Sequence, residues 1–527
     1  MTDGTEHSAA RAAVTGQPRG QPRAPRRSSG QITFSSTPGR WVLAVTVLGS
    51  GMVFLDGTVV NVALPTIGKD LHATTSQLQW VLNGYLLTLA SLILLGGSLG
   101  DRHGRRRVFA LGVIVFTLSS LLCALAPTVE LLIAARLVQG VGGALLTPGS
   151  LAMIESSFRA SDRARAIGAW SGLGGVATAL GPLLGGYLVS AVSWRAVFLI
   201  NLPLGLFVVA AAARHVPETR DPTASGRLDL SGALLAGLGL AGTTYALIEA
   251  PSGASAPVVL TGVLGVLALV GFLLRERRTD NPMMPLGLFA SRQFSAANAV
   301  TFVVYAALGG VFFLLVSFLQ ISLGYSPIAA GAASLPVTLL MLLLSARSGA
   351  LAQRIGPRIP LTLGPLVIAA GLLLMTRIAP GDSYISSVLP AVCVFGLGLT
   401  LVVAPVTATV LAAADERHSG IASGINNAIS RVGGLLAVAV LPLIAGLTGT
   451  RFYNPAAMTN GFHTAMVACA ILAAFGGVLA WLTISSDVLH AEGGAGEEER
   501  PAIEPGYSCD VAGAALRPGV PASVSKI

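Results

Sequence analysis

Gly96-Gly-Ser-Leu-Gly-Asp-Arg-His-Gly-Arg-Arg-Arg107 decides how the rest of the chain is arranged. The apolar stretches on either side, residues 78–99 and 108–126, each have about the 20 residues that a helix needs to cross the hydrocarbon core of a membrane. The segment between them is therefore a short loop at a membrane surface. Because its four arginines match the excess of Arg and Lys in cytoplasmic loops, we expect it on the cytoplasmic side.

The composition of the whole chain is that of a membrane protein. Of its 527 residues, 53% are hydrophobic and only 11% are charged, and the mean hydropathy is +0.74, so no water-soluble fold could bury this much apolar surface. The formal charge of +9 is spread over short loops, which argues against nucleic-acid binding. The four cysteines form no CxxC pair and have no closely spaced histidine, so neither a disulfide framework nor a metal site is expected.

Apolar stretches long enough to span a membrane alternate with polar or Gly/Pro-rich segments along the chain. The polar segments 1–40 and 485–527 have no apolar periodicity, and they are predicted to be disordered tails. An even number of spans puts both tails on the same side. The fourteen expected spans are residues 41–64, 78–99, 108–126, 130–153, 166–190, 196–213, 229–249, 257–274, 296–320, 329–351, 360–378, 385–412, 420–447 and 462–484.

Loop charges test this topology. With the N-terminus in the cytoplasm, the loops predicted outside carry only Lys69, Arg195, Arg377 and Arg451. This asymmetry supports the number of spans and predicts that both termini lie in the cytoplasm. The predicted inner loops contain Arg102, Arg105, Arg106, Arg107, Arg159, Arg163, Arg165, Arg214, Arg220, Arg227, Arg275, Arg277, Arg278, Arg292, Arg354, Arg358 and Arg417.

An internal repeat relates the basic loop to the loop after the tenth span, because residues 97–106 align with residues 349–358. The chain therefore has two related halves. We predict six-helix bundles at residues 41–213 and 296–484, with two inserted transmembrane helices at residues 229–274. The matching pairs are Gly97 with Gly349, Leu99 with Leu351, Arg102 with Arg354, Gly104 with Gly356, and Arg106 with Arg358.

Several motifs in a fixed order make the chain resemble the major facilitator superfamily and, within it, the fourteen-span drug:proton antiporters. The resemblance covers roughly residues 41–484. It implies two six-helix bundles around a cavity at the middle of the membrane, two extra helices at the side, and proton-driven export by alternating access. Besides the basic loop, the motifs are Leu55-Asp-Gly-Thr-Val-Val-Asn-Val-Ala-Leu-Pro65, Gln79-Trp-Val-Leu-Asn-Gly-Tyr85, Arg136-Leu-Val-Gln-Gly140, Gly181-Pro-Leu-Leu-Gly-Gly186 and Ser193-Trp-Arg-Ala-Val-Phe-Leu-Ile-Asn-Leu-Pro203.

Two charged residues lie well inside the predicted spans. Asp56 is about 15 residues past the start of the first span, where an ionised carboxylate is unfavourable by about 2.5–3.5 kcal/mol. Burial favours the neutral form, as a proton carrier requires, although a structural hydrogen bond to a neighbouring helix would also explain the residue. Arg136, one turn before Gln139, cannot discharge. The resemblance implies that Arg136 takes part in proton transfer with Asp56; a purely structural pairing is the alternative.

The resemblance also implies a cytoplasmic gate and an antiporter helix. Asp101 and Arg105 have the i, i+4 spacing of a local ion pair, and Asp101 would face the start of the late span near residue 420, holding the cytoplasmic side shut. In the fifth span, glycines allow close helix contact and a proline bends the helix, which predicts a pliable contact; simple close packing is the alternative. The gate residues are Gly97, Asp101, Arg102, Gly104 and Arg105, and the antiporter helix contributes Gly181, Pro182, Gly185 and Gly186.

Arg431 lies about 12 residues into the thirteenth span, roughly 18 Å along the helix. Such a cation either lines the cavity, where it would attract an anionic or oxygen-rich substrate, or pairs with an acid from the other half. Aromatic side chains of the ninth span, such as Tyr305, stack on a flat drug or pack in the core. The candidates for the substrate cavity are Asn61, Asn83, Gln139, Tyr305, Asn426, Asn427 and Arg431.

These features predict a proton-coupled antiporter of the cytoplasmic membrane that exports a small lipophilic drug, antibiotic or toxic metabolite. The expected partners are this substrate, protons and the lipid bilayer; we expect a monomer, no cofactor, no metal, and the proton gradient as energy source. The sequence has no GxxxxGK[ST] loop, which argues against an ATP-driven pump. An intramembrane enzyme is not expected because no histidine lies mid-span, His463 being placed at the surface, at the start of the last span. A proton symporter that imports a small organic solute is the alternative.

Overall fold

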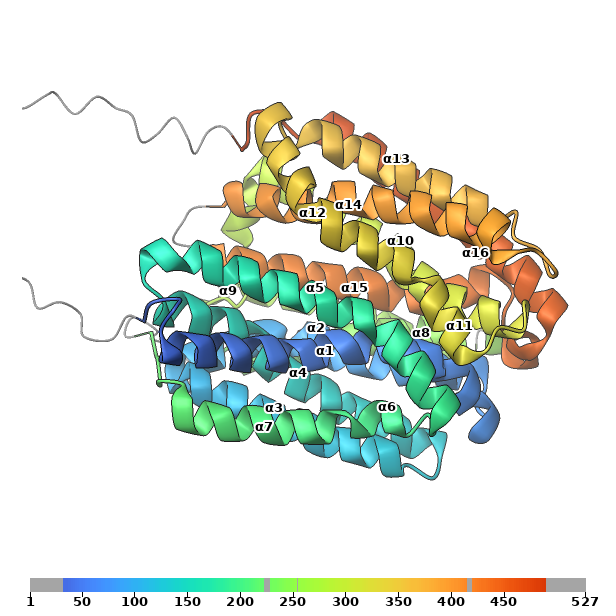
Figure 1. Cartoon of the computed structure of the whole chain (residues 1–527), viewed down its shortest axis with the longest axis horizontal. Helices are drawn as coiled ribbons and strands as arrows, with labels where there is room; N and C mark the ends of the chain where they lie inside the picture. The colour runs from blue at the N-terminus through green and yellow to red at the C-terminus, as the bar shows by residue number, and fades with distance from the viewer. Residues whose placement is uncertain (1–31, 222–227, 254, 415–418, 490–527) are drawn as a thin grey trace, which may run out of the picture.

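The computed structural model describes residues 32–221, 228–253, 255–414 and 419–489. The regular structure of these residues is helical, apart from one backbone bridge between Ile32 and Phe158. In this part of the chain, fourteen helical segments are long and apolar enough to cross a membrane, and they lie roughly side by side (Figure 1). The prediction of an all-α membrane protein with fourteen spans is confirmed.

The first bundle contains six spans, and local capping explains where they begin. The first helix starts at Thr37, four residues before the predicted start, because the Ser36 side chain accepts a hydrogen bond from Gly39 N and a proline occupies the first turn. Thr74 and Gln77 form a capping box at the start of the second helix. The helices are α1 (Thr37–Asp70), α2 (Thr75–His103), α3 (Arg105–Leu125), α4 (Val129–Ser157), α5 (Ala160–Ala191), and α6 (Ala196–Leu199) continued by α7 (Asn201–His215).

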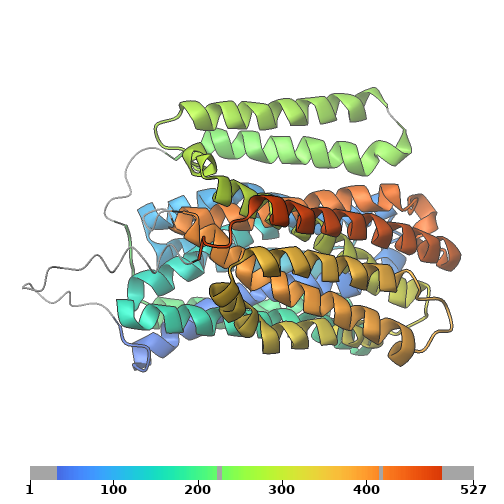
Figure 2. The same ribbon diagram turned by 90° about the horizontal axis from the view of Figure 1, so that it is seen from above.

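The inserted pair of helices lies at one edge of the molecule. α8 (Leu230–Glu249) contacts α2 and α15 (Ser419–Ile444), one helix from each bundle, so it covers a line along which the bundles meet. α9 (Ala256–Arg278) packs on α8 through close backbone contacts at Gly239 and Gly265. Figure 2 shows this hairpin outside the main body of the protein. The two extra spans are thus a lateral addition to the bundles.

The second bundle also contains six spans. The last helix, α16 (Pro455–Thr483), begins seven residues before the predicted start because the Asn454 side chain accepts a hydrogen bond from Ala457 N. His463 therefore lies about two turns inside α16, half-buried, with its Nε2 atom 2.9 Å from the carbonyl oxygen of Ile378; the expectation that it begins the span is wrong. The other helices are α10 (Arg292–Ile321), α11 (Pro327–Ala333) continued by α12 (Leu335–Ile355), α13 (Arg358–Met375), the π-helical turn η3 (Tyr384–Val388) continued by α14 (Leu389–Ala412), and α15.

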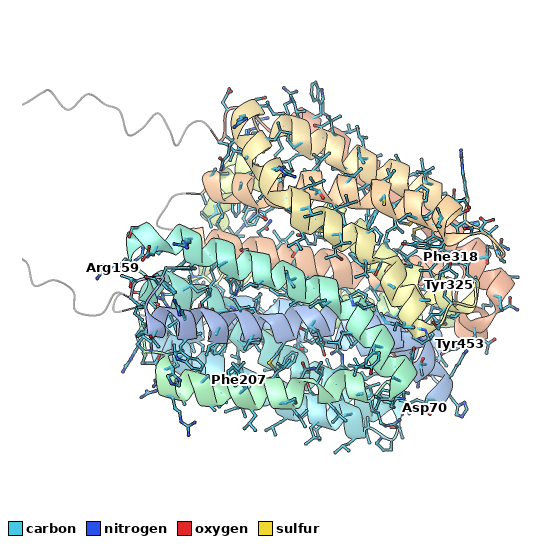
Figure 3. All side chains as sticks on the ribbon, viewed as in Figure 1. Asp70, Arg159, Phe207, Phe318, Tyr325 and Tyr453 are labelled. Atoms are coloured by element: carbon cyan, nitrogen blue, oxygen red, sulfur yellow. The ribbon has the colours of Figure 1, made fainter. Side chains whose placement is uncertain are left out.

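The spans run between two ends of the molecule, which we call the basic end and the opposite end. Arg159 marks the basic end, which also carries the arginine-rich loop between α2 and α3 (Figure 3). Asp70, Tyr325 and Tyr453 mark the opposite end.

Side-chain hydrogen bonds between the two bundles gather toward the opposite end. Each of them ends on a backbone carbonyl oxygen of the other bundle. Toward this end the bundles are therefore held together by α1, α2, α10, α15 and the turn before α16. The bonds run from Thr75 Oγ1 to Gly449 O (2.9 Å), from Gln79 Nε2 to Val438 O (2.7 Å), from Gln320 Nε2 to Val62 O (2.9 Å) and from Tyr453 Oη to Ala73 O (2.6 Å).

The helix α5 shows how the bundles separate toward the basic end. Near the opposite end, a methyl group on Gly186 would lie 2.6 Å from Ile328 Cα, so α5 and α11 touch through their backbones. Closer to the basic end, at Gly168, Gly172 and Gly175, no described atom lies within 4 Å of the place of a Cβ atom. Figure 1 shows α5 meeting α11 at one end and lying apart from α12 at the other. On this side of the molecule the bundles touch near the opposite end and lie apart toward the basic end, whereas Gly424 of α15 lies against Leu94 of α2 nearer the basic end.

Candidate functional site

Asp56 and Arg136 form an ion pair in the interior of the first bundle. Asp56 lies in α1 and Arg136 in α4, and neither side chain is more than 1% exposed. Arg136 Nη1 is 2.5 Å from Asp56 Oδ2, which is a short charge-assisted hydrogen bond. The two residues that the sequence singled out at membrane depth are therefore in direct contact.

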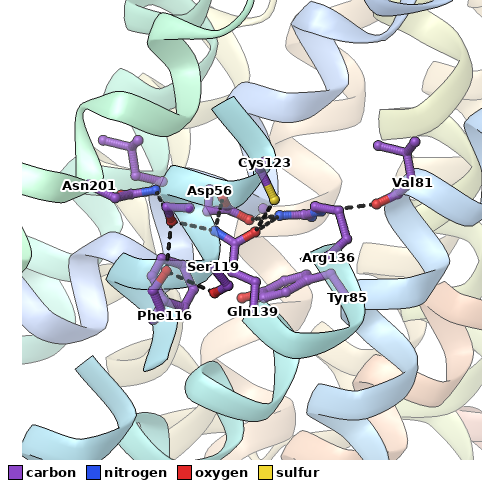
Figure 4. A network of polar contacts seen from close by, with 12 residues as sticks. Asp56, Val81, Tyr85, Phe116, Ser119, Cys123, Arg136, Gln139 and Asn201 are labelled. Atoms are coloured by element: carbon purple, nitrogen blue, oxygen red, sulfur yellow. Dashed lines mark hydrogen bonds and ion pairs between the residues drawn. The ribbon is translucent and has the colours of Figure 1, made fainter. Parts of the chain in front are cut away.

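Gln139 completes the hydrogen bonding of this carboxylate. It lies one turn after Arg136, so both side chains leave α4 on the same face. Its Nε2 atom donates to Asp56 Oδ1 (2.9 Å), and its Oε1 atom accepts from Arg136 Nη1 (2.6 Å). Each carboxylate oxygen thus has its own donor (Figure 4). A neutral amide bonded to both charged groups fixes their relative position.

A chain of neutral polar groups extends from Gln139 to the neighbouring helices. Gln139 Nε2 also donates to Ser120 Oγ in α3 (2.8 Å), and Asn201 Nδ2 at the start of α7 donates to the same oxygen (3.2 Å). The Ser120 hydroxyl in turn donates to the carbonyl oxygen of Phe116 (2.8 Å). A change at Asp56 can therefore reach four helices of the first bundle: α1, α3, α4 and α7.

The guanidinium group of Arg136 is also held from α2. Its Nε atom donates to the carbonyl oxygen of Val81 (3.0 Å), and the group lies over the Tyr85 ring, 4.4 Å from the centroid. The ring of Phe198 is 5.9 Å away. Cation–π contacts reach about 2 kcal/mol when desolvated. These contacts do not depend on the charge of Asp56, so they keep Arg136 in place if the acid becomes neutral.

The site is electrically balanced only while Asp56 is ionised. Arginine stays protonated in proteins, and removing one partner of a buried ion pair leaves an uncompensated charge that costs about 3–5 kcal/mol. Protonation of Asp56 removes the negative partner in the same way. A proton on Asp56 therefore weakens the contact between α1 and α4, and the arrangement can convert a proton into a change of helix packing.

In the described part of the chain, the other residues predicted to line a substrate cavity make no hydrogen bond to this network. Asn426 donates to Asn298 Oδ1 (3.2 Å) and Thr301 Oγ1 (2.9 Å), so it ties α15 to α10. Asn61 and Asn427 donate to carbonyl oxygens one turn earlier in their own helices. The amide N–H groups of these three side chains therefore have hydrogen-bond acceptors within the protein, and no ligand is needed to explain them.

Three further cavity candidates make no hydrogen bond within the described residues. Asn83 is fully buried, and neither its Nδ2 nor its Oδ1 atom has a partner there. Tyr305 and Arg431 are half-buried. Of the seven candidates, only Gln139 belongs to the Asp56 network, and the role of the other six in substrate binding stays a prediction.

The sequence did not identify Ser120, Tyr85 and Asn201, nor Cys123, whose thiol lies 3.7 Å from Gln139 Oε1, as members of the network. Asn201 stands in the Ser193–Pro203 motif as an amide between apolar residues, which is a usable signal of a polar contact at depth. Ser120 and Tyr85 give no such signal. A hydroxyl in a membrane helix can bond to its own backbone, and an aromatic ring is common in an apolar core, so their contacts depend on how the helices pack.

The basic loop contains the predicted local ion pair. Arg105 Nη2 is 2.8 Å from Asp101 Oδ1. Gly104 has a φ of +111°, and a methyl group there would lie 2.7 Å from the Glu218 carboxylate, so the turn requires glycine. No described contact joins Asp101 to the start of α15, where the place of a Cβ atom at Gly420 is open. The latch across the basic end stays a prediction for a state in which that end is closed.

The segment that follows α7 binds the basic loop through hydrogen bonds and an ion pair. The carbonyl oxygen of Thr219 accepts from Arg105 N (2.9 Å). The Glu218 carboxylate accepts from Arg106 N (3.1 Å) and lies 3.6 Å from Arg106 Nε. The sequence predicts only that this segment is one of the inner loops. Its contacts with the basic loop could not be predicted, because Glu218 is more than 100 residues away from Arg106 in the chain.

Two more gate candidates, Gly97 and Arg102, lie where α2 ends. Gly97 faces Pro148 of α4, at 3.6 Å from the place of a Cβ atom. Arg102 lines a polar cavity of about 240 Å³ together with Asp229 and Asp280, which flank the inserted hairpin. The basic loop is therefore in contact with both α4 and the base of the hairpin.

The predicted antiporter helix packs directly beside Asp56. A methyl group on Gly181 would collide with the Thr58 side chain, and one on Gly185 would lie 3.1 Å from the carbonyl oxygen of Val59. Thr58 and Val59 follow Asp56 by two and three residues in α1. The close contact that the glycines allow is present; its pliability stays a prediction.

Known proteins with similar sequences have names that refer to drug resistance. The sequence model of the Major Facilitator Superfamily matches residues 46–438. The chain is 38% identical to the puromycin resistance protein pur8 of Streptomyces alboniger, over 85% of this chain and 91% of that protein. It is 38% identical to the methylenomycin A resistance protein of Bacillus subtilis, over 87% and 98%. It is also 38% identical to the multidrug resistance protein Stp of Mycobacterium tuberculosis, over 76% and 74%.

Among solved structures, the chain is similar to the crystal structure of a bacterial homologue of the human lysosomal transporter Spinster, in an inward-facing and unoccupied conformation. The TM-score is 0.61, and the match covers 87% of this chain and 99% of that chain at 18% sequence identity. At this identity the likeness concerns the fold alone.

Proposed function

The chain belongs to the Major Facilitator Superfamily, and from this membership we propose that it exports a small lipophilic antibiotic, drug or toxic metabolite in exchange for protons. It is a multi-pass membrane transporter and not an enzyme. The exchange takes place across the cytoplasmic membrane, with the basic end and both termini in the cytoplasm, and the monomer is the functional unit. The names of the relatives, which refer to resistance against puromycin and methylenomycin A, support export of compounds of this kind.

The buried ion pair between Asp56 and Arg136 is the observation that carries the proton coupling. Asp56 is the acid of the pair, it lies in the middle of α1, and it is 1% exposed. An ionisable residue inside a membrane span is costly, and such residues mark proton or substrate pathways. Because Arg136 cannot give up its proton, Asp56 is the residue of the pair that we assign as the proton carrier.

The cycle follows from the charge of Asp56 and from the separation of the bundles beside α5 toward the basic end. When the opposite end opens, a proton from outside neutralises Asp56, weakens its bond to Arg136 and disturbs the α1 face on which α5 packs. The substrate leaves in this state. After the protein returns to the state open at the basic end, the proton passes to the cytoplasm and the ion pair forms again. A membrane potential contributes about 2.3 kcal/mol per charge per 100 mV.

Efflux from cells tests this proposal. Cells that express the wild type, Asp56→Asn or Asp70→Asn are loaded with members of a panel of lipophilic antibiotics and dyes, and retention is followed with and without a proton uncoupler. Asp70 is a matched control because it lies in the same helix, half exposed, in an ion pair with Arg195 at the opposite end. We expect export by the wild type and by Asp70→Asn, and loss of export with Asp56→Asn or with the uncoupler.

Other outcomes identify what is wrong with the proposal. Normal export by Asp56→Asn that the uncoupler still abolishes would place the proton carrier elsewhere. Export that resists the uncoupler would exclude proton antiport. Proton-driven accumulation of a compound, in place of its export, would identify an importing symporter.

A further inference from the structure

Arg431 is a cation inside a membrane span that the protein itself does not neutralise. It lies 12 residues after the start of α15, roughly 18 Å along the helix. Its side chain is half-buried, and within the described residues it makes no hydrogen bond and no ion pair. Arg136, the other arginine at depth, has an acid, an amide and a backbone carbonyl as partners. The sequence left open whether Arg431 pairs with an acid of the other half; no described acid fills that role.

Two tyrosine side chains, one from each bundle, lie near this charge. Arg431 lies close enough to Tyr85 of the first bundle and Tyr305 of the second to interact electrostatically with both phenol groups. The hydroxyl of Tyr85 is buried and has no hydrogen-bond partner in the described structure, and the same holds for both amide atoms of Asn83 two residues earlier. A buried polar group without a partner is unfavourable by about 1–3 kcal/mol in free energy. An acceptor oxygen of a ligand bound to Arg431 would give the Tyr85 hydroxyl the hydrogen-bond partner that it lacks.

The backbone that carries Arg431 is held firmly. Five residues earlier, Asn426 bonds to Asn298 and Thr301 of α10. Two residues later, a methyl group on Gly433 would lie 2.8 Å from the carbonyl oxygen of Phe302, so α15 and α10 touch through their backbones. The guanidinium group therefore projects from a fixed point, and a ligand that binds it need not order the helix first.

We propose that Arg431 binds the anionic group of the transported compound, a carboxylate or an ionised phenol or enol, and that the protein selects acidic substrates over cationic ones. Guanidinium forms paired hydrogen bonds with carboxylates, and Tyr305 and Tyr85 supply further donors beside it. The same positive charge disfavours a lipophilic cation at this place. This inference rests on the proposed export function and adds the charge of its substrate.

Two dyes that share a xanthene ring test the inference. Fluorescein is an anion and rhodamine 6G a cation, and their uptake into everted vesicles is followed under an imposed proton gradient. The variants are Arg431→Gln, Arg431→Lys and, as a matched control, Arg347→Gln, which removes an exposed arginine of α12. Binding of fluorescein to the purified proteins is measured in parallel by fluorescence anisotropy. Thermal unfolding and gel filtration confirm that each variant is folded.

We expect the wild type to bind and transport fluorescein in preference to rhodamine 6G. Loss of a charged hydrogen bond raises the KM and Kd of Arg431→Gln for fluorescein roughly ten- to hundredfold, while Arg431→Lys stays within a few-fold of the wild type and Arg347→Gln matches it. Equal fluorescein affinity in Arg431→Gln, or no fluorescein binding by the wild type, would overturn the inference.

The failure of this inference is distinguishable from the failure of the proposed function. Gradient-driven transport of a cationic or neutral compound that is insensitive to Arg431→Gln would leave export intact and remove the preference for anions. Absence of gradient-driven transport for every compound of the antibiotic and dye panel would refute the export function itself.

Discussion

Arg136 and Arg431 are both arginines inside membrane spans, but only Arg136 has hydrogen-bond partners among the described residues. This difference suggests different roles for the two residues. Arg136 is 1% exposed and bonded to Asp56, Gln139 and the Val81 carbonyl oxygen. Arg431 is half-buried and has no acceptor among the described residues. An arginine with a full set of internal partners stabilises one packing of its helices, whereas an arginine without partners is available to a ligand.

A double-mutant cycle on the Asp56–Arg136 pair tests how the pair is balanced. Arg136→Gln leaves a buried carboxylate without its cation, so we expect it to lower the free energy of unfolding by about 3–5 kcal/mol. Adding Asp56→Asn removes that unpaired charge, so the double variant is more stable than Arg136→Gln alone. The measurement is equilibrium unfolding in detergent. Effects of the two single substitutions that simply add would show that the pair is not coupled.

At the scale of single helices, α1 links the ionisable site to the glycine-rich face of α5. It carries Asp56 on the side of α4, and Thr58 and Val59 on the side of α5. The two contacts are less than one turn apart, so a shift of α1 after protonation is felt at the α5 contact. The rigid spacing of a helix is enough to connect them, and no longer chain of contacts is needed.

Alanine substitutions in α5 test this link. A methyl group on Gly181 collides with Thr58, whereas one on Gly175 meets no described atom within 4 Å. We expect Gly181→Ala to reduce the rate of proton-driven export about tenfold or more, since misplacement near a functional site has effects of this size, and Gly175→Ala to export as the wild type does. Both variants are compared at equal membrane expression. Equal rates for the two would refute a role for the close α1–α5 contact.

The start of α8 gives a prediction about pH. Burial raises the pKa of Asp229, but bonds from Gly232 N (2.9 Å) and Ser231 Oγ (2.8 Å), together with the charge of Arg275, more than offset this and hold the pKa below its usual value. A lowered folded-state pKa contributes stability above the unfolded pKa of about 3.9, and this stability is lost as the pH falls through the folded value.

Asp229→Asn isolates this contribution, because asparagine still caps the helix but does not titrate. The wild type is expected to unfold at a higher temperature than the variant, by a constant margin above about pH 5, and the margin should shrink as the pH falls below about 4. Thermal unfolding at a series of pH values measures it. A margin that persists or widens on acidification would mean that the carboxylate is not stabilised in the folded state.

At the scale of the whole molecule, a small set of hydrogen bonds joins the two bundles at the opposite end, and water can replace each of them. Thr75, Gln79, Gln320 and Tyr453 reach across the bundles to backbone carbonyl oxygens, and no described ion pair joins the bundles. Contacts of this kind can be exchanged for water at low cost, since each side chain and carbonyl group can be solvated. This is the property that a reversible closure needs, and it favours alternating access.

The sequence was sufficient to predict the membrane spans and the charged residues inside them. Hydropathy determines where a chain crosses a membrane, and a charged residue is conspicuous within an apolar stretch. The pairing of Asp56 with Arg136 was also within reach, since each needs the other to be stable there. The sequence did not reveal Ser120 as the hydroxyl that receives Gln139, nor Glu218 as the acid that fastens the basic loop. Both belong to contacts between distant segments, which only the packing of the helices decides.

In the proposed cycle, a proton on Asp56 and the substrate exclude each other. Purified protein in a weakly buffered solution with a pH-sensitive dye tests it most directly, on addition of a compound that the efflux assay identifies. We expect that binding releases protons from the wild type and from Asp70→Asn, and none from Asp56→Asn. Equal release from Asp56→Asn and the wild type, or binding to the wild type without any release, would contradict it.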